Sequence, residues 1–149
     1  MIKKIFLCIV ILSLNNCGYE AIYSKKNVFN DEIQSFETEG DKKINRKIIS
    51  SLKLKNQAEN SGYKLTINSS KSLETILKDS SGRASTYNLK INVVVSLIKE
   101  EKIFKTKNFN SNFTFNNNEN KFDLAQYQKD IEANLIDRII QEIIIFLTF

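Results

Sequence analysis

Histidine and proline are absent from the 149-residue sequence, and cysteine occurs only twice, as Cys8 and Cys17. Without histidine the chain cannot form a Ser-His-Asp triad, and two cysteines without an imidazole make none of the common zinc sites. The sequence also contains no glycine-rich phosphate loop and no GxSxG nucleophile elbow. We therefore expect no enzyme activity, no metal centre and no cofactor.

Arginine is scarce, with only Arg46, Arg83 and Arg138 in the chain. The formal net charge of +5 falls to +3 when Lys3 and Lys4 of the N-terminal segment are left out. Nucleic-acid binders usually combine a strong basic excess with clustered arginine, because a guanidinium group pairs with phosphate through two hydrogen bonds. A mild lysine excess does not fit that pattern, and we expect no nucleic-acid partner.

The first 17 residues have the three parts of a secretory signal. Two lysines precede the apolar run Ile5–Leu14, and Cys17 follows it. This run is shorter than the roughly 20 residues that a membrane-spanning helix needs, but it matches the hydrophobic part of a signal peptide. The alternative is a buried N-terminal helix or strand of a cytosolic domain. It is disfavoured because residues 15–18 (NNCG) form a turn-like stretch that suits a core poorly.

Leu14 lies three residues before Cys17, and this stretch resembles the lipobox of bacterial lipoproteins. The resemblance implies that the signal is cut before Cys17 and that this residue carries several acyl chains, which together hold a protein stably on a membrane. Asn15 and Asn16 depart from the usual lipobox pattern. In such lipoproteins an aspartate directly after the cysteine is a signal for retention in the inner membrane. Residue 18 is a glycine, so the resemblance implies delivery to the outer membrane. We therefore predict a lipoprotein signal peptide over residues 1–16 and an N-terminal anchor and linker over residues 17–30.

A two-residue hydrophobic period predicts the strands of a sheet. The clearest example runs from Thr86 to Leu97, where apolar residues alternate with Thr, Asn, Lys and Ser. Such a strand has one face in the core and the other face in water or against a partner. Shorter patterns predict strands over residues 32–39, 63–67 and 109–115, and residues 72–78 either extend the second of these or bulge from it.

Two amphipathic helices are also predicted. Isoleucine and leucine residues between 44 and 52 fall on one stripe of a helix that Asp41 can cap, and the lysine-rich opposite face is expected to be solvated. A second helix spans residues 123–147, with Asp123 as its predicted N-cap. The order strand, helix, three strands, helix predicts one α+β domain over residues 31–149. We expect a two-layer sandwich of about four mainly antiparallel strands, with both helices on one face.

Several segments taken together resemble the LPS-assembly lipoprotein LptE family in its alphaproteobacterial form. They are the lipobox followed by Gly18-Tyr19, the stretches GYKL (62–65) and GRASTYNLKI (82–91), a Phe-rich strand ending near residue 115, and the terminal LAQYQKDIEANLIDRIIQEIIIFL (124–147). The resemblance covers most of residues 14–147. It implies a non-catalytic LptE-like domain on the periplasmic side of the outer membrane, held there by acyl chains on Cys17. In that family the domain is the plug and assembly partner of the LptD β-barrel, in the transport of lipopolysaccharide to the cell surface.

The polar face of the strand over residues 86–97 supplies the candidate contacts, which are Asn88, Lys90 and Asn92. Uncharged polar side chains suit the polar lumen of a barrel, and lysines can meet lipid phosphates as point charges. Ordinary solvent exposure would give the same alternation. A second class of function also stays open, namely a stand-alone periplasmic chaperone or pilotin-like lipoprotein that serves another outer-membrane complex.

Overall fold

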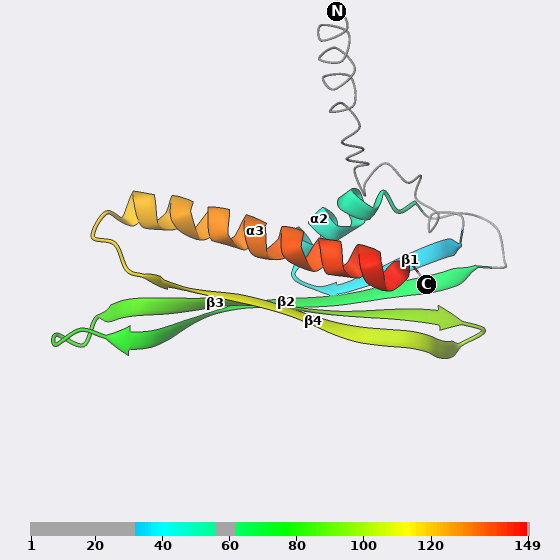
Figure 1. The fold of residues 1–149 in the computed structure, drawn as a ribbon, viewed down its shortest axis with the longest axis horizontal. Coiled ribbons are helices and arrows are strands. Elements are labelled where there is room, and N and C mark those ends of the chain that lie inside the picture. Colours follow the sequence, from blue (N-terminus) through cyan, green and yellow to red (C-terminus); the bar gives the residue numbers. More distant parts are fainter. Residues whose placement is uncertain (1–31, 56–61, 149) are drawn as a thin grey trace, which may run out of the picture.

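A computed structural model describes residues 32–55 and 62–148 of the chain (Figure 1). The predicted signal peptide, the anchor and linker, and the lipid-attachment residue Cys17 lie outside the described residues. No helix in the described ranges is long and apolar enough to cross a membrane.

Four strands form one mixed sheet in the order β1-β2-β3-β4. Strand β1 is parallel to β2, because the chain between them passes through helix α2, whereas β2, β3 and β4 follow each other through short turns and pair antiparallel. Both helices cover the same face of this sheet (Figure 1). The predicted two-layer α+β sandwich is therefore confirmed. The elements are β1 (Ile33–Gly40), α2 (Lys42–Leu52), β2 (Tyr63–Lys78), β3 (Ala84–Lys99), β4 (Lys102–Asn116) and α3 (Lys121–Leu147).

The three long strands are joined by short turns, and one of them is irregular near its end. Strand β2 is continuous from Tyr63 to Lys78 and carries a register shift between Thr75 and Leu77, so residues 72–78 both extend the strand and bulge from it. The turn between β3 and β4 places Glu100 and Glu101 at positive φ, 51° and 62°. Two successive left-handed residues match the right-handed twist of the strands on either side.

Helix α2 begins where the sequence predicts. The Asp41 carboxylate accepts hydrogen bonds from the backbone N–H groups of Lys43 and Ile44, at 2.9 and 3.0 Å. Before this cap the chain turns sharply at Gly40, which has a φ of 88° and leaves no room for a Cβ beside the Ser69 carbonyl oxygen. Strand β1 therefore ends beside Ser69, and the second half of β2 extends beyond it.

A buried amide joins the end of β1, the start of α2 and the middle of β2. The Asn45 side chain is 3% exposed; its Nδ2 donates to the Glu39 carbonyl at 2.8 Å, and its Oδ1 accepts from the Ser69 hydroxyl at 2.7 Å. Ser69 is itself buried, so the amide gives its hydroxyl a hydrogen-bond partner away from water.

Helix α3 lies along β3 and β4 and places seven apolar residues in the core. Its N-cap is Asn120, whose Oδ1 accepts from the backbone N–H groups of Phe122 and Asp123 at 3.0 and 3.4 Å. The prediction of Asp123 as the cap was wrong, because the apolar stripe begins one turn after the helix does. Asp123 instead lies in the first turn, where its negative charge interacts favourably with the positive end of the helix dipole. The core residues of α3 are Ile131, Leu135, Ile136, Ile139, Ile140, Ile143 and Leu147.

The two helices are linked by ion pairs that sequence patterning did not predict. Glu132 of α3 has a side chain only 6% exposed, and it binds Lys43 of α2 at 2.8 Å and Lys71 of β2 at 3.0 Å. Lys47 of α2 pairs with Asp137 at 2.8 Å. Part of the lysine face that we expected to be solvated therefore packs against α3. Burial raises the pKa of Glu132, but the hydrogen bonds and charges of Lys43 and Lys71 outweigh it, so the pKa lies below its ordinary value.

We predict that Asn45→Ala lowers the free energy of unfolding by about 2 kcal/mol, because it removes both hydrogen bonds of a buried amide, one of them to the buried Ser69 hydroxyl. The matched control is Asn68→Ala, which removes an exposed side-chain hydrogen bond to Glu39 and should cost about 0.5 kcal/mol or less. Urea unfolding followed by circular dichroism measures both. Equal losses in the two variants would contradict the assignment of Asn45 as a buried junction.

We also predict a pH-dependent effect of Glu132→Gln. The lowered pKa of Glu132 means that its ion pairs stabilise the fold above the ordinary value of 4.5 and are lost as the pH falls through the lower folded-state pKa. The variant should lose about 2 kcal/mol at pH 7, and this difference should shrink at pH 3. Asp137→Asn, which breaks the more exposed pair with Lys47, is the control and should cost about 0.5 kcal/mol or less. A Glu132→Gln difference that is the same at both pH values would contradict the account.

Candidate functional site

The sheet face turned away from the helices carries a continuous field of small polar side chains. Because cross-strand partners share a face, the registers of β2, β3 and β4 define five rungs of three residues each. We call these fifteen residues the open face. Twelve of them are Ser, Thr or Asn, and the other three are Glu74, Lys90 and Val94. The rungs are Glu74-Asn88-Thr114, Ser72-Lys90-Asn112, Ser70-Asn92-Asn110, Asn68-Val94-Asn108 and Thr66-Ser96-Thr106.

The three contact residues predicted from the sequence lie next to one another on the open face. Asn88, Lys90 and Asn92 alternate along β3, so their side chains emerge on the same side of the sheet. Asn88 donates from Nδ2 to the Thr114 hydroxyl at 2.8 Å, whereas its Oδ1 is buried and has no hydrogen-bond partner within the described part of the chain. Because this oxygen is shielded from solvent, an outside donor does not reach it in this structure.

The positive charge of Lys90 is already compensated. Its Nζ lies 2.7 Å from the Glu74 carboxylate, and both side chains are about half exposed. A pair of this kind contributes little to stability but cancels the charge locally. The open face is therefore close to neutral and is suited to hydrogen bonding more than to capturing an anion.

A hollow of about 380 Å³ crosses the middle rungs of the open face. Apart from Ile91, its lining residues carry hydroxyl or amide groups or the amine of Lys90, so it offers both donors and acceptors. Sequence reasoning selected the β3 residues and missed those of β2 and β4, because the strand register was unknown. The signal in β4 was the alternation of Asn with other residues between 108 and 112. The polar side chains around the hollow are Ser70, Ser72, Lys90, Asn92, Asn110 and Asn112.

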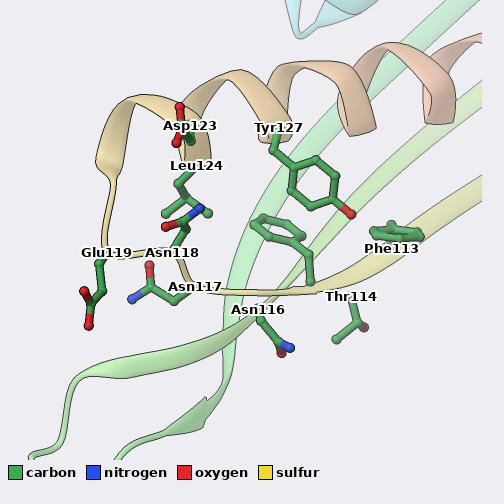
Figure 2. A pocket seen from close by; sticks show the side chains of 10 residues that line it. Phe113, Thr114, Asn116, Asn117, Asn118, Glu119, Asp123, Leu124 and Tyr127 are labelled. Atoms are coloured by element: carbon green, nitrogen blue, oxygen red, sulfur yellow. The ribbon is translucent and has the colours of Figure 1, made fainter.

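A second concavity lies between the first turns of α3 and the end of β4 (Figure 2). It is open to solvent, has a volume of about 920 Å³, and has an apolar wall in which Tyr127 and Phe115 meet edge to face at 6.0 Å. Its opposite side is polar and includes the carboxylates of Glu119 and Asp123. These acidic groups disfavour a phosphate-bearing ligand. Among the described residues there is also no group of three or more Asp, Glu, His or Cys side chains that could hold a metal ion.

No protein-family profile and no curated protein matches the sequence. The fold, however, is similar to that of several bacterial lipoproteins of known structure. Rare lipoprotein B from Shewanella oneidensis matches with a TM-score of 0.52 and 15% identity, over 73% of this chain and 92% of that one. The minor lipoprotein from Acinetobacter baumannii matches with a TM-score of 0.54 and 13% identity, over 74% and 87%. An uncharacterized lipoprotein B from Nitrosomonas europaea matches with a TM-score of 0.55 and 13% identity, over 75% and 80%.

The chain has the fold of these lipoproteins. Sequence identities of 13–15% show only that the fold is shared. The role of the open face therefore has to be argued from its own chemistry.

Proposed function

We propose that this chain is an outer-membrane lipoprotein whose domain is the plug and assembly partner of an LptD-like β-barrel in lipopolysaccharide transport. The observation that carries the proposal is the open face, which is large, polar and nearly free of charge. Only two of its fifteen residues are charged, compared with 26% of the whole chain. Strand β1 adds Glu37 and Glu39 at the edge of the same face, because they pair with Thr66 and Asn68, so the nearly neutral field is confined to the three long strands.

A polar and neutral surface suits the inside of a large barrel. The lumen of an outer-membrane barrel is lined by polar side chains, and a plug has to replace the water that those groups would otherwise bind. Ser, Thr and Asn can donate and accept hydrogen bonds, so they pair with such a wall without the desolvation cost of a buried charge. The helices already cover the other face of the sheet, which leaves the open face for this contact.

The membrane attachment in the proposal rests on Cys17. Its position after a short apolar run matches the lipobox, and several proteins that share the fold are described as lipoproteins. Acyl chains on Cys17 would hold the domain at the periplasmic face of the outer membrane. The sequence contains none of the catalytic motifs considered above, and the proposed role requires no catalysis.

Lipopolysaccharide enters the proposal as the cargo of the complex. Its phosphates would have to compete with Glu74 for Lys90, because that ion pair is already formed at 2.7 Å. The neutral hydroxyls and amides around the hollow can bind sugar hydroxyls without such competition. Contact of Lys90 with the lipid therefore requires an exchange of partners.

One observation favours the second candidate function, a chaperone-type or pilotin-like lipoprotein. Large apolar side chains are exposed around the concavity shown in Figure 2, including Phe113 and Tyr127, which are 43% and 48% exposed. Such a surface can hold an apolar segment of a client protein. The two functions are separated by which protein the chain isolates with, a large barrel or a component of another secretion complex.

We predict that placing charge on the open face disrupts binding to the barrel. Asn92 and Asn110 are cross-strand neighbours, and the variant Asn92→Lys with Asn110→Lys should reduce co-isolation with a large outer-membrane barrel at least tenfold. The control is Asn134→Lys with Gln141→Lys, which adds the same charge at exposed positions of α3 and should bind like the wild type. Circular dichroism checks that both variants are folded. Full co-isolation of the open-face variant would contradict the proposal.

We further predict that the protein extracted from membranes begins at Cys17 and carries about three acyl chains. Mass spectrometry of the intact protein measures both the start of the chain and the added mass. The variant Cys17→Ala should be folded but absent from the outer membrane. An unprocessed N-terminus, or an unmodified Cys17 in the membrane fraction, would contradict the lipid anchor.

A further inference from the structure

Exposed apolar side chains gather at the two ends of the sheet. We call the near end the one where β1 and β2 begin, where β3 turns into β4 and where α3 finishes, on the right of Figure 1. The far end holds the turn between β2 and β3 and the start of α3. Within the described ranges, nine large apolar side chains are exposed. Ile103, Phe104 and Ile145 lie at the near end, and Leu73, Ile76, Leu77, Phe113, Phe122 and Tyr127 lie in the far half.

The near end combines apolar side chains with aromatic rings and lysines. Phe104 packs on Tyr63 with ring centroids 5.2 Å apart, and Lys99 lies over the same Tyr63 ring at 5.2 Å. Lys105 lies 4.6 Å from the centre of the Phe146 ring. Aromatic residues and lysines with apolar stems are the side chains that favour the interface between lipid and water.

The covalent path from Cys17 also leads to the near end. The first described strand begins at Ile33, which pairs with Tyr63, and the fifteen residues 18–32 connect it to Cys17. Fifteen residues span at most about 50 Å. Strand β3, with sixteen residues, is itself about 50 Å long. A lipid-anchored chain could therefore bring the far end to the membrane only by extending the whole connection alongside the domain.

From these observations we infer that the near end rests on the phospholipid surface that holds the acyl chains of Cys17. The inference rests on the acylation in the proposed function and does not depend on the barrel partner. Ile103, Phe104 and Ile145 contact the membrane at headgroup depth. Lys99 and Lys102 lie beside anionic headgroups there. Glu100 and Glu101 are exposed in the turn between these lysines and keep the contact shallow, because carboxylates stay in water.

The far end is the less suitable membrane contact although it exposes more apolar surface. Its concavity carries the carboxylates of Glu119 and Asp123, but Arg83 and Lys121 lie beside it. Distance from the lipid anchor, and not charge, therefore disfavours this end, which lies at the opposite end of the domain from Ile33. The two ends therefore give a matched pair of positions for a test of which one meets the lipid.

The sequence contains no tryptophan, so one introduced tryptophan reports a single position. Ile103→Trp places the probe at the near end, and Phe122→Trp places it at the far end, where the native side chain is 79% exposed. Each variant is extracted from membranes as the mature chain and reconstituted into vesicles of phosphatidylglycerol and brominated phosphatidylcholine. We expect emission from Ile103→Trp to be quenched at least twofold relative to vesicles without bromine, and emission from Phe122→Trp to be unchanged.

Mass spectrometry of the same samples reports whether Cys17 is acylated. If it is not, the Cys17 thiol is coupled to a maleimide-bearing lipid in the vesicles, so that the position of the domain is measured whether or not the cell adds acyl chains. Absence of quenching for Ile103→Trp, or equal quenching at both ends, would overturn the inference in either preparation. Failure of acylation alone would overturn only the anchor in the proposed function.

Discussion

Two helices cover only one face of a sheet whose three long strands have fifteen or sixteen residues each, and the rest of the molecule depends on this constraint. The alternating residues of β3 that point towards the helices are apolar, and Leu89, Ile91, Val93 and Val95 are almost completely buried. Within the described part of the chain, no segment lies over the residues between them. Packing of the core therefore does not determine these residues, and their polar and nearly neutral composition can match a binding partner.

The helix layer is held by specific polar contacts as well as by apolar packing. Asn45 joins α2 to the two strands beneath it, and Glu132 joins α3 to both α2 and β2. These groups are shielded, so each would be costly to leave without its partner. These contacts fix the position of the helices on one face of the sheet. The opposite face therefore stays uncovered by them.

Local patterns were sufficient to predict the fold class, because β3 and α3 have clear periods and an apolar stripe begins at Ile44, three residues after Asp41. The parallel pairing of β1, the Asn120 cap and the pairs of Glu132 were not predictable in this way. They depend on where distant segments meet, and a stripe of isoleucines does not show which residue one turn earlier caps the helix. For the same reason Asn88, Lys90 and Asn92 could be selected from β3 alone, whereas Glu74, Ser70 and Asn110 became part of the site only through strand register.

The most direct test of the central claim is to ask which surface of the domain touches another protein in the intact envelope. A photo-crosslinking amino acid placed at Asn110 reports on the open face, and one placed at Gln141 reports on the solvent side of α3. Irradiation of living cells followed by mass spectrometry identifies the captured protein. A large outer-membrane barrel captured from position 110 and not from position 141 is the predicted result. Capture from position 141 alone, or no capture from position 110, would contradict the account.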